Sequence, residues 1–97
     1  MQVKVRFYGF VQDVVGPTPQ SVELPDGGTL RNLFELLAER LGERLRERLF
    51  NRAGELETNV RIFIGDSQAS SLEESLGEGE RNPAEVKVFV LLATAGG

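Results

Sequence analysis

The sequence contains no cysteine, no histidine and no tryptophan among its 97 residues. Without cysteine, the chain has no disulfide, no thiolate nucleophile and no thiolate ligand for zinc or an iron–sulfur cluster. Without histidine, it has no side chain whose unperturbed pKa lies near neutral pH, and no imidazole to bind a metal. These absences remove most of the groups that a self-sufficient enzyme uses. We therefore expect no bound metal or cofactor, and we expect a partner to supply any catalysis.

Basic residues are also scarce relative to acidic ones. Fifteen Asp and Glu residues against eleven Lys and Arg residues give a formal net charge of −4. This balance argues against nucleic acid and against anionic lipid as partners, because both attract clustered positive charge. No apolar run approaches the roughly 20 residues of a membrane-spanning helix. The first residues alternate polar and apolar side chains, unlike a signal peptide, so we expect a cytoplasmic protein.

Four segments show the patterns of β-strands. Apolar residues alternate with polar ones over residues 3–7, 21–24 and 60–64, as in strands with one buried face. The first two segments flank a Gly-Pro-containing loop and predict a hairpin. Residues 85–92 are apolar on both faces, which favours a central position in the sheet.

The remaining periodic segments predict helices. Thr29 is a suitable N-cap, and the apolar residues that follow it are spaced three and four apart up to Leu41. A second short helix is expected over residues 43–50, and the polar segment 67–85 is expected to hold only a short strand or helical turn. This order predicts an α+β fold, a mixed sheet with one main helix packed on one face, typical of the ubiquitin-like β-grasp. We expect a β-grasp domain over residues 1–92 and a flexible tail over residues 93–97.

The tail ends in Gly96 and Gly97. Five extended residues reach at most about 17 Å, and two residues without a Cβ atom can pass through a narrow cleft. The terminal carboxyl is ionised at neutral pH and is a poor electrophile, so acyl chemistry at Gly97 would need prior activation, such as adenylation by another enzyme. The alternative is a frayed end without function.

A second candidate site is the face of the sheet that points away from the helix. If Val60, Ile62 and Ile64 face the helix, Phe63 faces outward, and the same alternation turns Phe89 and Leu91 outward. The predicted docking patch consists of Phe63, Phe89 and Leu91, with Arg6 and Arg61 at its rim. An apolar patch with a charged rim is typical of protein-binding surfaces. The alternative is that the loop over residues 66–85 covers this face.

Several segments resemble the small sulfur-carrier proteins typified by the small subunit of molybdopterin synthase. Residues 3–16 are similar to the family's opening strand and turn, residues 28–33 to its helix entry, residues 59–66 to its third strand and residues 95–97 to its terminus. Residues 49–57 also resemble the mycobacterial-type carrier that delivers sulfur for cysteine synthesis. Two features depart from the family pattern: the segment 76–85 is longer than the usual tight acidic turn, and no proline precedes the glycine tail.

The resemblance implies a carrier that is a cosubstrate and not a catalyst. An adenylyltransferase of the ubiquitin-activating type would use ATP and magnesium to adenylate Gly97, and a sulfurtransferase would then provide sulfur for a thiocarboxylate. A larger molybdopterin synthase subunit would accept the tail, with Gly96 threading its channel, while the docking patch binds the partners in turn. Three alternatives remain open: a sulfur carrier for cysteine or thiamine synthesis, a ubiquitin-like protein modifier, and a β-grasp interaction domain with incidental glycines.

Overall fold

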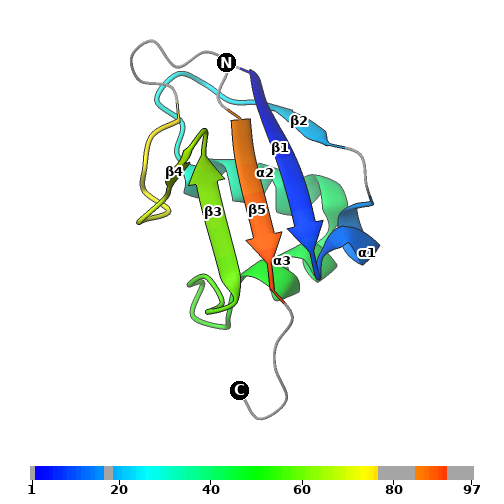
Figure 1. The fold of residues 1–97 in the computed structure, drawn as a ribbon. Coiled ribbons are helices and arrows are strands. Elements are labelled where there is room, and N and C mark those ends of the chain that lie inside the picture. Colours follow the sequence, from blue (N-terminus) through cyan, green and yellow to red (C-terminus); the bar gives the residue numbers. More distant parts are fainter. Residues whose placement is uncertain (1, 17–18, 77–84, 92–97) are drawn as a thin grey trace.

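The computed structural model of the chain describes residues 2–16, 19–76 and 85–91. They form a five-stranded mixed sheet with helices on one face, as Figure 1 shows. The strand order is β2-β1-β5-β3-β4. The strands are β1 (Gln2–Gly9), β2 (Gln20–Glu23), β3 (Val60–Ile64), β4 (Ser67–Gln68) and β5 (Glu85–Val90).

The centre of the sheet is the parallel pair β1 and β5. Their register runs from Lys4 opposite Glu85 to Gly9 opposite Val90. β2 pairs antiparallel with β1, and β3 pairs antiparallel with both β5 and β4. The predicted hairpin of the first two strands and the predicted central position of the last strand are thus confirmed.

Three helices pack on the same face of the sheet. They are α1 (Gln12–Val15), α2 (Leu30–Leu41) and α3 (Glu43–Leu49). Thr29 caps α2 as predicted: its side chain accepts a hydrogen bond from the Asn32 amide, and the Asn32 side chain accepts one from the Thr29 amide. None of the helices in the described ranges is long and apolar enough to cross a membrane.

The core lies between the sheet and α2. In β1, β3 and β5, buried residues alternate with exposed or half-buried ones, so one face of each of these strands is buried in the core. The apolar stripe of α2 closes this core, and its buried members are Leu30, Leu33, Phe34, Leu37 and Ala38. No polar or charged residue is buried among the described residues.

The described part of the predicted polar segment belongs to the helix layer. Leu72 and Leu76 are buried, and backbone bonds tie this stretch to the start of α2: the Arg31 amide donates to Leu72 O, and the Leu76 amide donates to Gly28 O. In Figure 1 this stretch, drawn in yellow, lies to the side of the sheet. Residues 69–76 therefore do not cover the outer face of the sheet, and residues 77–84 lie outside the described residues.

Two boundaries differ from the sequence-based expectation. The first strand ends at Gly9 and is followed by α1, a helix too short to show a helical period in the sequence. The last strand ends at Val90, although the apolar pattern continues to Leu92, because its neighbour β3 begins at Val60, the partner of Val90. The proposed division at residue 92, with a flexible tail over residues 93–97, lies outside the described residues and stays a prediction.

We predict that Gly9→Ala is far more destabilising than Gly27→Ala. Both glycines have a left-handed backbone, with φ of +85° and +83°, so alanine costs about 1–2 kcal/mol at either position. At Gly9 the new Cβ would also collide with the carbonyl oxygen of Val90, whereas at Gly27 it meets nothing within 4 Å. Moving that carbonyl distorts the β1–β5 pair and adds about 1–3 kcal/mol. Urea unfolding measures both free energies, and equal losses in the two variants would contradict this account.

Candidate functional site

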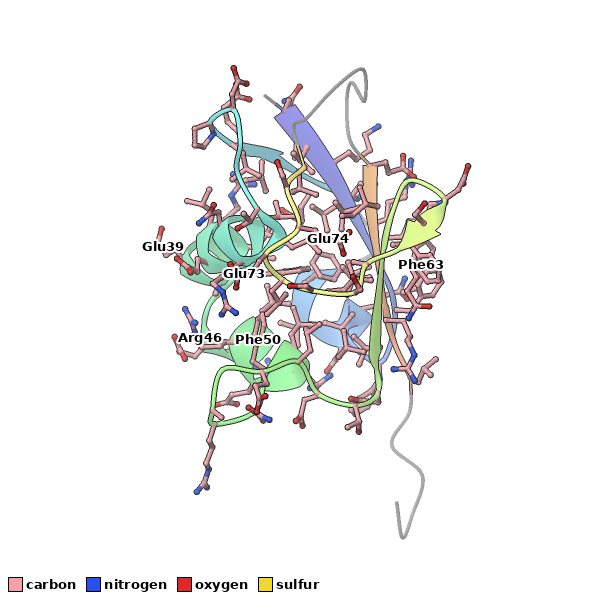
Figure 2. All side chains as sticks on the ribbon, turned by 90° about the vertical axis from the view of Figure 1, so that its left-hand side faces the viewer. Glu39, Arg46, Phe50, Phe63, Glu73 and Glu74 are labelled. Carbon is pink, nitrogen blue, oxygen red and sulfur yellow. The ribbon has the colours of Figure 1, made fainter. Side chains whose placement is uncertain are left out.

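Three aromatic rings form a continuous cluster on the outer face of the sheet. Tyr8 of β1 lies directly opposite Phe89 of β5, and their rings stack with centroids 4.7 Å apart and planes 13° from parallel. Phe63 of β3 meets Phe89 edge to face, with centroids 5.6 Å apart. We call these three residues the aromatic cluster. Figure 2 shows Phe63 on the side of the sheet away from the helices.

The aromatic cluster is accessible. Tyr8 is 36% exposed, and Phe63 and Phe89 are half-buried. A hollow of about 230 Å³ lies beside two of the rings and is lined by Phe63, Gly65, Asp66, Lys87 and Phe89. An aromatic surface with an adjoining hollow can receive an apolar side chain of another protein.

Positive charge surrounds the aromatic cluster. The outward positions of β1, β5 and β3 carry four cations, Lys4, Arg6, Lys87 and Arg61, and one carboxylate, Glu85, for a net charge of +3. Arg6 pairs with Glu85 at 3.7 Å, and Arg61 donates to the carbonyl oxygens of Thr58 at 2.6 Å and Val60 at 3.0 Å. This face is basic in a chain whose formal net charge is −4.

The structure brings together most of the predicted docking patch. Phe63 and Phe89 are in contact, and Arg6 and Arg61 lie on the same face. Leu91 is 51% exposed and lies one residue beyond β5. The prediction missed Tyr8, which the alternation of Val3, Val5 and Phe7 places outward with Lys4 and Arg6. That these residues bind a partner stays a prediction.

The chain leaves the sheet from a firmly held point. The Leu91 amide donates to the Asn59 carbonyl oxygen at 2.9 Å, and the Asn59 side-chain amide donates to the Leu91 carbonyl oxygen at 2.7 Å. The Phe10 amide donates to Val90 O at 2.7 Å from the other side. Residues directly next to both strands that flank β5 thus hold its end. Gly96 and Gly97 lie outside the described residues.

An ion pair fixes the helices at this same end of the sheet. Arg48 of α3 donates to both carboxylate oxygens of Asp13 in α1 at 2.8 Å, and to the carbonyl oxygen of Phe10 at 2.8 Å. Its guanidinium carbon also lies 4.4 Å from the centre of the Phe10 ring. The hydrogen bonds from Arg48, helped by the charges of Arg48 and Arg44, lower the pKa of Asp13 below its ordinary value of 3.8.

The described residues offer no metal site. Among them, no group of three or more carboxylates is placed to hold a metal ion. Glu73 instead bonds Arg31 at 2.7 Å, and Glu74 accepts the amides of Ser70 and Ser71 as a loop cap. These carboxylates therefore serve local structure.

Solved structures of small ubiquitin-like proteins share this architecture. SAMP1 of Haloferax volcanii superposes with a TM-score of 0.80 at 18% identity, covering 97% of this chain and 99% of that chain. A putative molybdopterin converting factor, subunit 1, from Pyrococcus furiosus gives 0.69 at 25% identity, covering 95% and 99%. A chain of the BexX/CysO complex of Amycolatopsis orientalis gives 0.70 at 17% identity, covering 95% and 98%.

These similarities confirm the predicted fold, a ubiquitin-like β-grasp with a mixed sheet and its helices on one face. No protein-family model matches the sequence, and no curated protein sequence matches it.

We predict that the Asp13–Arg48 pair makes stability depend on acid pH. The folded-state pKa of Asp13 is depressed, so its contribution is fully present above the unfolded-state pKa and disappears as pH falls through the folded value. Asp13→Asn should therefore lower Tm at pH 7 and lower it by less at pH 2.5. Thermal unfolding followed by circular dichroism measures both differences. Added salt should shrink the difference at pH 7, since the carboxylate is exposed; a difference of the same size at both pH values would overturn the prediction.

Proposed function

We propose that the chain is a ubiquitin-like sulfur carrier whose Gly97 carboxylate is adenylated, converted to a thiocarboxylate and used as a sulfur donor in molybdopterin synthesis. The observation that carries the proposal is the way the last described strand ends. β5 is the central strand, and Leu91 beyond it is held by two hydrogen bonds to Asn59 beside an exposed aromatic face. A Gly-Gly segment that follows so firm an attachment is well suited to reach into a partner's active site.

The chemistry at Gly97 requires an activating partner. A carboxylate resists nucleophilic attack, and this chain has no cysteine, so neither the activation nor the sulfur comes from its own side chains. An adenylyltransferase of the ubiquitin-activating type would join Gly97 to AMP with ATP and magnesium, releasing pyrophosphate. A sulfide equivalent from a sulfurtransferase would then displace AMP and leave the thiocarboxylate. Gly96 would thread the narrow part of each partner's channel.

The outer sheet face would dock these partners in turn. The predicted patch of Phe63, Phe89 and Leu91, with Arg6 and Arg61 at its rim, gains Tyr8 as a further aromatic contact. Aromatic and arginine side chains contribute much of the binding energy at protein interfaces. The basic rim favours partners whose docking surfaces are acidic.

Molybdopterin synthesis is the proposed destination because a putative molybdopterin converting factor subunit is the most similar in sequence of the three structures compared above, at 25% identity. The acceptor would be the large subunit of a molybdopterin synthase. Delivery of sulfur for cysteine or thiamine synthesis remains the alternative.

A second candidate function is protein modification, in which an activated Gly97 forms isopeptide bonds with lysines. The similarity to SAMP1 of Haloferax volcanii, the small archaeal modifier protein 1, favours it. Both functions begin with adenylation of Gly97 and differ in whether a sulfur donor or a lysine amine attacks.

We predict that incubation with the adenylyltransferase of the same cell, ATP, magnesium and a sulfur donor replaces one oxygen of Gly97 by sulfur. Intact-mass spectrometry measures this increment, and fragmentation locates it. A variant that lacks Gly97 should show no increment yet unfold at the same Tm. Absence of the increment with an adenylyltransferase shown to be active would refute the carrier function, and lysine adducts in a lysate would favour the modifier.

We predict that Tyr8→Ala impairs activation whereas Leu36→Ala does not. Tyr8 and Leu36 are 36% and 37% exposed, but Leu36 lies on α2, on the opposite side of the sheet. Loss of an aromatic docking contact should raise the KM of the adenylyltransferase for the carrier about tenfold and leave kcat unchanged, since the chemistry is at Gly97. Pyrophosphate release measures both constants. Equal effects of the two variants would exclude the outer face as the docking surface.

A further inference from the structure

A cavity of about 260 Å³ opens on the helix side of the molecule, away from the aromatic cluster. Figure 2 shows Arg46 and Phe50 on this side, with Phe63 on the other. Residues from α2, from α3 and from the loop after α3 line the cavity: Arg31, Phe34, Glu35, Arg46, Phe50, Asn51, Arg52 and Gly54. Three arginines and one glutamate line the cavity, and two adjoining carboxylates, Glu43 and Glu73, pair with two of these arginines and offset the +2 of the lining.

Two of these arginines are held in place through a single nitrogen. Arg31 Nε donates to Glu73 at 2.7 Å, and Arg46 Nε donates to Glu43 at 3.3 Å. The terminal nitrogens of both guanidinium groups have no partner among the described residues, and both side chains are 45% exposed. Arg52 has no ion pair within the described part of the chain. A guanidinium fixed at Nε presents its two terminal nitrogens as a planar fork, the geometry that binds a carboxylate through two bonds.

The floor of the cavity is apolar and well ordered by its contacts. Phe34 is buried, and its ring meets the half-buried ring of Phe50 edge to face at 6.0 Å. The loop after α3 forms one wall of the cavity. It is closed by the Phe50–Leu56 bridge and by the Asn51 amide, which donates to Glu55 O at 2.8 Å. The Asn51 side-chain oxygen accepts the amides of Ala53 and Glu55. The cavity therefore combines an aromatic surface with the guanidinium groups of Arg31 and Arg46.

The size of the cavity favours an anchor from a protein over a cofactor. At about 260 Å³ it is smaller than the roughly 300–1,000 Å³ of small-molecule sites, and it accommodates one or two side chains. We propose that this cavity binds an acidic segment of a partner protein, in which an apolar side chain rests on Phe50 and a neighbouring carboxylate bonds Arg31 or Arg46. Because the cavity and the aromatic cluster lie on opposite sides of the sheet, the chain can bind this segment while another protein occupies the sheet face. The proposal does not depend on the chemistry at Gly97.

The test is a titration of the isotope-labelled protein with the peptide acetyl-Glu-Phe-Glu-amide, followed by amide chemical shifts. We expect shifts at residues 31, 35 and 50–54, and binding about tenfold weaker for acetyl-Gln-Phe-Gln-amide, since a charge-assisted bond is lost. Arg46→Ala should weaken binding about tenfold, with Arg46→Lys intermediate because lysine keeps the charge without the fork. Arg44→Ala is the matched control, an exposed arginine of α3 that does not line the cavity.

Four results would overturn the proposal. They are the absence of shifts at the cavity, equal binding of the glutamine peptide, an equal loss in Arg44→Ala, and inorganic phosphate binding as tightly as the glutamate peptide. The last result would assign the cavity to a small free anion. Thermal unfolding of each variant separates a loss of binding from a loss of folding.

Discussion

The parallel pairing of β1 and β5 is the contact on which the rest of the structure depends. Parallel neighbours cannot be joined by a tight turn, so the chain between them must cross the sheet, and here that crossing includes α2 and α3. The crossing closes the core on one face and leaves the other face open. It also makes β5 central, with β1 and β3 on either side. Gly9 permits the close approach at the end of this pair, because any Cβ there would collide with the Val90 carbonyl.

The outer face of the sheet differs in charge from the rest of the chain. The outward positions of the three central strands sum to +3, and the formal charge of the whole chain is −4, so the remainder of the chain carries −7. Separation of charge on this scale orients a small protein as it approaches a charged partner. The arginine-lined cavity is a local exception on the helix side, where Glu43 and Glu73 orient the cations that surround it. An acidic partner can therefore meet a basic surface on the sheet face, and on the helix side guanidinium nitrogens that have no partner among the described residues.

Periodicity predicted the parts of this structure that depend on side-chain alternation. Val60, Ile62 and Ile64 point inward and Phe63 outward, as a two-residue period requires, and the stripe on α2 follows in the same way. Tyr8 obeys the same rule, since it follows Lys4 and Arg6 at a two-residue period on the outward face of β1. The Asn59–Leu91 bonds join residues 32 apart in sequence, and the cavity combines residues from 31 to 54. No local sequence pattern encodes such contacts, so the sequence alone could not predict them.

On the proposed function, the absence of histidine and cysteine also constrains how the carrier could be regulated. Neither candidate binding surface carries a histidine or a cysteine, the side chains whose ordinary pKa values lie closest to neutral. Protonation of a histidine or a cysteine thus cannot time the carrier's release from one partner and its capture by the next. On the proposed function, that order must depend on the chemical state of Gly97. A carboxylate and a thiocarboxylate carry the same single negative charge, so a partner that distinguishes the loaded from the unloaded carrier must sense the larger, more polarisable sulfur atom.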